Sequence, residues 1–298
     1  VIGLLAIFQA NQLTAVLQAV ILEPDSMEET IRNRWIIGII LMLMTATVIL
    51  GGIKRIAAVA SALVPFMVGI YFFTVLIIVV QHFGDIPEMF KLIFVDAFTG
   101  NAVMGGAVGS VIIVGARRAA FSNEAGIGTA PMVHGQSKNS EPIREGLIAM
   151  LGPFIDTVVV CTLTALAILL TGVWESTEND GVKLTLSAFE SGIPGVGKYL
   201  LMISVLVFAL STMFTYSYYG HKCMNYLFGA DKADYYNYFY LATIVMGAVV
   251  SLEVVVSLVD GMYAIMAFPN MIAAIYLAPK VKAASKDYFE RIKQKNLQ

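Results

Sequence analysis

The chain has 298 residues, of which 58% are hydrophobic and 13% are charged, with a formal net charge of -2. Soluble domains carry about 25% charged residues, so this composition excludes an ordinary water-soluble domain and indicates that lipid is the solvent. The net charge identifies no partner, and we expect no nucleic acid among the partners.

A helix that crosses a bilayer needs about 20 mostly apolar residues. In chain order, eight segments reach or approach that length: residues 1–22, 34–53, 57–81, 103–120, 146–171, 199–220, 237–256 and 260–279. All should be helices, because an open strand in lipid leaves backbone groups unpaired. The sequence therefore predicts an all-α integral membrane protein. An apolar run begins at residue 1, so we expect the chain to start inside a membrane helix of a longer protein.

Basic residues predict the orientation, because cytoplasmic loops carry an excess of Lys and Arg. Alternate connections place 14 of the 19 basic residues on one side: Lys54, Arg55, Arg117, Arg118, Lys138, Arg144, Lys222, Lys232, Lys280, Lys282, Lys286, Arg291, Lys293 and Lys295. We therefore expect a single transmembrane domain over 1–298, in the cell (plasma or inner) membrane, with a basic cytoplasmic tail over 280–298.

Three connections are long. Residues 82–102 and 172–198 lie on the expected outer side, and each contains a possible short helix, at 87–94 and 185–191. Residues 121–145 lie on the expected inner side. Such loops either form gates or simply connect helices.

Glycines crowd the fourth segment, GNAVMGGAVGSVIIVGARRAA, where Gly105, Gly106 and Gly109 follow one another closely. Because glycine is unfavourable in a helix interior, they allow a break whose free amides and carbonyls bind an ion or a carboxylate. Close helix packing through small residues is the other interpretation, and the residues alone favour it slightly, since Gly105 and Gly109 have the required spacing.

The sixth segment contains FALSTMFTYSYYG, with adjacent hydroxyls at Ser211 and Thr212. Hydroxyl and carbonyl oxygens are suitable sodium ligands. Alternatively, these hydroxyls bond the preceding carbonyls of their own helix.

Ionisable groups inside a bilayer are costly and usually functional. Asp156 lies well inside the fifth segment and is a candidate for an ion path or for locking helices together. Gln9 and Asn11 interrupt the apolar first segment and either bond a neighbouring helix or face a substrate.

Motifs for other functions are missing from the sequence. It contains neither the GxxxxGK[ST] loop of ATP-driven proteins nor an HExxH zinc motif. The helices carry no readable nucleophile–base pair, so we expect no enzyme. Cys161 and Cys223 are interpreted as unpaired small apolar residues.

Several stretches resemble the alanine or glycine:cation symporter family over nearly the whole chain. The most specific is FSNEAGIGTAPMVHG at 121–135, and the others are GGIKRIAAVASALVPFM, EPIREGLIAMLGPFIDTVVVCTLTAL, FALSTMFTYSYYG and AFPN. The resemblance implies a LeuT-type fold of two inverted five-helix repeats, in which this chain supplies the third to the tenth core helix.

The resemblance also implies three sets of site residues. They are a substrate site at Gln9, Gly105, Gly106, Gly109, Thr212 and Val256, a sodium site at Phe208 (through its carbonyl), Ser211 and Thr212, and a gate or coupling set at Asn123, Glu124 and Asp156. The implied function is symport of a small neutral amino acid with sodium, without another cofactor, by alternating access.

The sequence departs from the family at Val256, where many relatives have a large aromatic residue, and this reshapes the expected substrate pocket. Two alternatives to sodium symport stay open. One is a proton-coupled amino-acid carrier that uses Asp156, and the other is a passive channel.

Overall fold

The computed structural model describes residues 6–98, 108–175 and 180–295, and within these ranges the chain is helical and has no strand. The helices are α1 Ala6–Leu17, α2 Met27–Ile49, α3 Gly52–Gln81, α4 Ile86–Phe98, α6 Val108–Asn123, α7 Ala130–His134, α8 Pro142–Pro153, α9 Thr162–Leu170, α10 Gly181–Gly192, α11 Gly197–Phe228, α12 Ala230–Val249 and α13 Leu252–Lys295. Two π-helical segments extend them, η2 Gln18–Leu22 after α1 and η4 Phe154–Cys161 between α8 and α9. The predicted all-α class is confirmed.

Five helical stretches in the described part of the chain are long and apolar enough to cross a membrane. They are Met27–Ile49, Gly52–Gln81, Pro142–Leu170, Gly197–Phe228 and Leu252–Gln294, and Ala6–Leu22 is a shorter apolar helix. Of the other two expected crossings, the fourth falls partly on residues 99–107, outside the described ranges. The seventh corresponds to α12, which begins with the polar sequence ADKAD.

Large apolar side chains lie on the outside of these helices. On α3, Phe66, Phe73 and Val80 are each more than half exposed. A protein in water would bury such side chains, whereas a bilayer solvates them. The helices are those of a multi-pass membrane protein.

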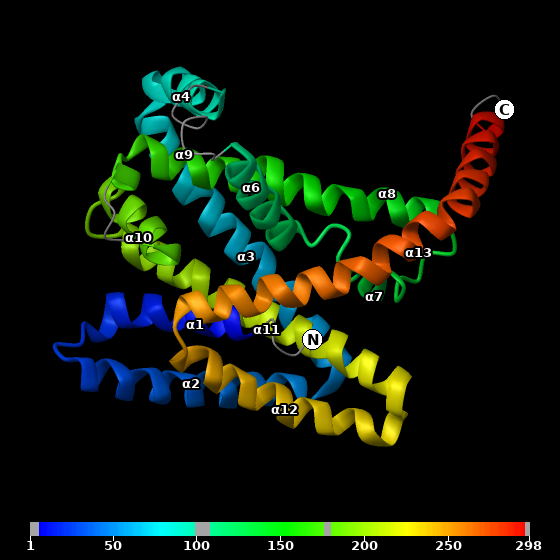
Figure 1. Ribbon diagram of the computed structural model, residues 1–298, viewed down its shortest axis with the longest axis horizontal. Helices are drawn as coiled ribbons and strands as arrows, with labels where there is room; N and C mark the ends of the chain where they lie inside the picture. Colours follow the sequence, from blue (N-terminus) through cyan, green and yellow to red (C-terminus); the bar gives the residue numbers. More distant parts are fainter. Residues whose placement is uncertain (1–5, 99–107, 176–179, 296–298) are drawn as a thin grey trace. The chain divides into compact units, whose positions relative to one another are not determined.

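The chain divides into two compact units, Val1–Ser110 with Val160–Val259, and Val111–Val159 with Asp260–Gln298. In the first unit, α1 packs against α11 and α12, α2 packs against α12, and α3 packs against α11. Figure 1 shows α2 and α12 side by side along much of their length. A second core of the same unit joins α3, α9, α10 and α11 around the fully buried Phe189.

Local sequence explains where several of these helices begin and end. Ser26 caps α2, because its Oγ accepts a hydrogen bond from the Glu29 amide at 3.2 Å. The turns from α2 to α3 and from α11 to α12 contain Gly52 and Gly229, whose φ angles are 73° and 87°. Glycine adopts this left-handed conformation without steric cost.

The predicted boundary between the seventh and eighth segments, at 256–260, is wrong. The break lies at Val250–Ser251, where Val250 is extended with ψ 153°. Residues 237–279 are mostly apolar, and the polar signal at the break is short, since Ser251 and Glu253 lie at the start of α13. The turn is stabilised from a distant helix, because the Asn11 side chain bonds the Val250 carbonyl at 2.7 Å.

The two short helices expected in the outer loops are confirmed as α4 and α10. Both are longer than the predicted ranges 87–94 and 185–191.

In the second unit, α13 packs beside α6. Arg118 forms an ion pair with Asp260 at 2.8 Å, and the rings of Phe121 and Tyr263 lie 5.5 Å apart. The predicted tail is helical, since α13 continues to Lys295.

Candidate functional site

Two of the expected site elements are neighbours in the first unit. Gln9 is half-buried on α1, and Phe208, Ser211 and Thr212 lie on the unbroken helix α11. Because α1 packs against α11, the polar positions that the sequence singled out belong to two helices in contact.

Ser211 and Phe208 bring two candidate sodium ligands together. Ser211 is buried, and its Oγ donates a hydrogen bond to the Phe208 carbonyl at 2.9 Å. This is the self-bonding that the sequence left open as an alternative for the hydroxyl. A donating hydroxyl keeps its own lone pairs, so Ser211 Oγ can still face a cation. The Phe208 carbonyl already accepts from this hydroxyl and from the helix amide four residues on, so a cation would take the place of the hydroxyl's hydrogen bond.

Thr212 follows Ser211 directly and is half-buried. One residue along an α-helix turns the side-chain direction by about 100°. The two side chains therefore leave α11 about 100° apart, a separation that still lets both reach one ion beside the helix, and Ser211 is the more buried of the two.

Asn11 bonds a neighbouring helix, which was one of the two roles predicted for it. The buried side chain donates through Nδ2 to the Gly247 carbonyl at 3.1 Å and to the Val250 carbonyl at 2.7 Å. Both carbonyls belong to the end of α12, so Asn11 holds α1 against that end.

Gln12 continues this network and was not singled out from the sequence. Its Nε2 donates to Asn11 Oδ1 at 3.0 Å, and its Oε1 accepts a hydrogen bond from the Val182 amide of α10 at 3.0 Å. The two adjacent amides therefore tie α10, α1 and α12 to one another. The only signal in the sequence was the pair of amides within an apolar stretch.

In the second unit, two of the expected gate residues meet in one polar cluster. The Oδ2 of Asp156, on η4, accepts a hydrogen bond from Ser122 Oγ at 2.5 Å. Next to it, Asn123 Nδ2 donates to Thr157 Oγ1 at 2.8 Å. Neighbouring residues of α6 thus pair with neighbouring residues of η4, and Ser122 and Thr157 are members that sequence reasoning missed.

Glu124 ends α6 in an unusual backbone conformation. Its φ is 54°, and its amide donates to the Ala120 carbonyl at 3.1 Å. Left-handed residues commonly terminate helices, but glycine usually occupies them.

Gly126 and Gly128 continue the turn after Glu124 with φ angles of 82° and 105°. Asn270 of α13 donates through Nδ2 to the Gly126 carbonyl at 2.8 Å. The FSNEAGIGTAP and AFPN motifs, about 140 residues apart in the sequence, are therefore in direct contact in the second unit.

Three glycines and Val256 complete the predicted set. Gly105 and Gly106 lie outside the described residues, and Gly109 is the second residue of α6. Val256 is half-buried in the first turns of α13. At Gly105 and Gly106 the predicted break falls outside the described ranges and stays a prediction, whereas from Val108 on, Gly109 included, the chain is helical.

Comparison with known proteins assigns the family. The family model of the sodium:alanine symporter family matches residues 1–298. The chain belongs to this family. The family is one of transporters, not of enzymes, and its name implies sodium and an amino acid as the transported pair.

Three individual relatives each align with most of the chain. An uncharacterized transporter of Haemophilus influenzae is 38% identical over 261 residues, which is 86% of this chain and 57% of the relative. The sodium/alanine symporter AgcS of Methanococcus maripaludis is 37% identical over 258 residues, again 86% and 57%. A sodium/proton-dependent alanine carrier protein of Bacillus sp. strain PS3 is 32% identical over 275 residues, 86% of this chain and 62% of the relative. The chain therefore spans less than two thirds of the length of each.

Proposed function

We propose that the protein carries a small neutral amino acid together with sodium across the cell membrane by alternating access. The observation that carries this proposal is the pair of oxygens at Ser211 and Phe208, 2.9 Å apart inside an apolar helix of a sodium:alanine symporter family member. Hard, uncharged oxygens suit sodium, and the Ser211 side chain is buried.

The proposed architecture is the LeuT-type inverted repeat, with eight crossings that supply the third to the tenth core helix. The C-terminus then lies in the cytoplasm. Helices broken near the bilayer midplane offer free backbone dipoles to substrates in transporters of this kind, and the closely spaced glycines of the fourth segment could form such a break.

In this scheme sodium is bound by the Phe208 carbonyl and by the hydroxyls of Ser211 and Thr212. The substrate is bound by backbone groups at Gly105, Gly106 and Gly109, with Gln9, Thr212 and Val256 around its side chain. The positive charge of the ion favours the carboxylate of a zwitterionic substrate nearby. The cluster of Asn123 and Asp156, with Glu124 at the helix end, acts as the inner gate.

Val256 bears on which amino acid is carried. A valine at this position occupies less volume than an aromatic residue and leaves room for a substrate side chain larger than a methyl group. We therefore propose a small neutral substrate of the alanine or glycine type, with space for modest enlargement.

The test is radiolabelled alanine and glycine uptake into proteoliposomes, with sodium or with choline outside. Combined Ser211→Ala and Thr212→Ala substitution should abolish the sodium-dependent part of uptake. Ser204→Ala is the matched control, because Ser204 is also a buried serine of α11 that donates to a carbonyl of its own helix, at 2.8 Å. Normal sodium dependence in the double variant, or equal loss in the control, would contradict the assignment.

A proton-coupled carrier is the second candidate, and Asp156 is the observation that favours it. Its carboxylate is half-buried and accepts a hydrogen bond from Ser122, and ionisable groups inside membrane segments are usually functional. Uptake driven by a pH gradient in choline medium separates the proton-coupled carrier from the sodium-coupled one. In a proton-coupled carrier, Asp156→Asn should abolish this proton-driven accumulation. Flux that never accumulates substrate against a gradient would instead indicate a passive channel.

A further inference from the structure

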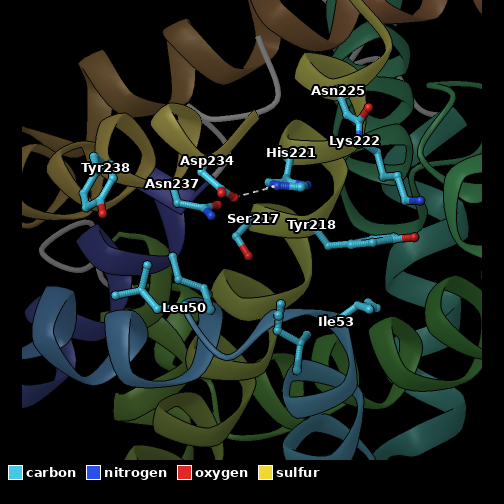
Figure 2. Close-up of a pocket in the computed structure, with 13 residues that line it drawn as sticks. Leu50, Ile53, Ser217, Tyr218, His221, Lys222, Asn225, Asp234, Asn237 and Tyr238 are labelled. Carbon is cyan, nitrogen blue, oxygen red and sulfur yellow. Dashed lines mark hydrogen bonds and ion pairs between the residues drawn. The ribbon is translucent and has the colours of Figure 1, made fainter. Parts of the chain in front are cut away.

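A pocket lies in the first unit where the turn between α2 and α3 faces the last turns of α11 and the first turns of α12 (Figure 2). Its volume is about 360 Å³, within the range of ligand sites, about 300–1,000 Å³. None of the residues assigned above to sodium, substrate or gate lines it. The pocket therefore requires an explanation of its own.

The pocket has one polar wall and one apolar wall. Figure 2 shows Leu50 and Ile53 across the pocket from His221 and Asp234. Leu50 is 58% exposed and Ile53 is 47% exposed, so these side chains still present apolar surface. An occupant that fits both walls is amphipathic.

The polar wall carries both signs of charge. His221 Nε2 donates to Asp234 Oδ1 at 3.2 Å, and the Asp234 side chain remains 82% exposed. The carboxylate is thus oriented by one bond and open to another. Lys222 supplies a cation, with its Nζ 5.4 Å from the centroid of the Tyr218 ring, and Asn225 adds amide donors beside it.

The pocket lies at the ends of membrane-crossing helices. The stretches that end or begin there include Met27–Ile49, Gly52–Gln81 and Gly197–Phe228, all long and apolar enough to span a bilayer. Helix ends meet the lipid headgroups, where tyrosine is enriched. Tyr226 and Tyr238 at this end are 90% and 63% exposed.

We propose that this pocket binds the headgroup of an aminophospholipid, the phosphoethanolamine group of a glycerophospholipid. The primary ammonium donates to Asp234, and the phosphate is held by Lys222 and Asn225. The adjoining acyl chain covers Leu50 and Ile53. A free amino acid has no alkyl chain for the apolar wall, and a choline headgroup has no N–H to donate.

The test is native mass spectrometry of the detergent-solubilised protein titrated with dioleoyl lipids that differ only in headgroup. We expect the ethanolamine lipid to bind about tenfold more tightly than the choline lipid, the effect of one charge-assisted hydrogen bond. Asp234→Asn should reduce ethanolamine binding to the choline level, and Asp234→Glu should restore the preference. Lys222→Gln should weaken both lipids together.

Asp231→Asn and Lys232→Gln are matched controls for the loss of one charge. Both residues lie in the first turn of α12, the helix that carries Asp234, and neither lines the pocket. They should bind lipid as the unchanged protein does. Equal binding of the two lipids, tighter binding of a glycerol-headgroup lipid, or displacement by millimolar alanine would each overturn the proposal. Sodium-dependent uptake by Asp234→Asn is measured separately, and its outcome leaves the lipid assignment unaffected.

Discussion

At Gly247 the backbone of α12 lies close to the backbone of α1, and replacement of this glycine by alanine tests the packing of the first unit. A Cβ added at Gly247 would lie 2.6 Å from the Ile7 carbonyl oxygen and 2.7 Å from Ile7 Cα. Both atoms are backbone of α1, so no side chain can rotate away. The two helices must separate.

The cost follows from two effects of that separation. Overpacking of this kind destabilises proteins by about 1–3 kcal/mol, and the hydrogen bond from Asn11 to the Gly247 carbonyl lengthens beyond its 3.1 Å. A net loss for that bond of about 1 kcal/mol is offset by the better helix propensity of alanine, also about 1 kcal/mol. We expect Gly247→Ala to lower the free energy of unfolding by about 1–3 kcal/mol.

The assay is reversible unfolding of the purified protein in mixed micelles, followed by circular dichroism as the denaturing detergent fraction rises. Gly69→Ala is the control, because Gly69 lies inside α3 and an added Cβ there meets nothing within 4 Å. That variant should be as stable as the unchanged protein or slightly more stable. If Gly247→Ala unfolds at the same detergent fraction as Gly69→Ala, the proposed backbone contact does not exist.

Three further predictions concern polar contacts. Gln12→Leu removes the acceptor of the Val182 amide, so α10 should exchange its amide hydrogens faster, whereas unchanged exchange would show that the bond does not hold α10. The two hydrogen bonds from Arg291 hold the pKa of Glu141 below its usual value. This contact should therefore stabilise the tail helix at neutral pH, and the stabilisation should be lost as the pH falls through that lowered pKa. Hydrogen exchange of the tail amides measures this pH dependence, and Glu141→Gln should remove it. Tyr240→Phe deletes a fully buried hydroxyl that donates to the Met213 carbonyl of α11 at 2.5 Å. The free energy of unfolding should fall by about 1–3 kcal/mol, and an unchanged value would show that this hydrogen bond does not stabilise the protein.

The turn between α12 and α13 shows one limit of what could be predicted from the sequence. The seventh and eighth segments form a nearly continuous apolar run, and the chain turns at Val250 because Asn11, on another helix, bonds its carbonyl. Residues 237–279 by themselves therefore do not reveal that Asn11 is the partner of this turn.

The candidate site shows a similar limit. The sequence indicated Asp156 and Ser211 as polar groups in apolar surroundings, because such groups are costly in lipid wherever they lie, and the family resemblance indicated Asn123. It did not indicate that Ser122 pairs with Asp156. Pairings of this kind depend on the rotation of each helix about its axis, which hydropathy does not report.

The sequence alone determined that this protein is a bundle of membrane helices of the sodium:alanine symporter family. Lipid allows the backbone almost no alternative to a helix, and the family motifs are long and specific. Only the tertiary structure decided which polar groups lock helices together, and it alone revealed the pocket between the α2–α3 and α11–α12 turns. Those outcomes depend on contacts between residues as far apart as Asn11 and Val250, and such contacts exist only once the helices have packed.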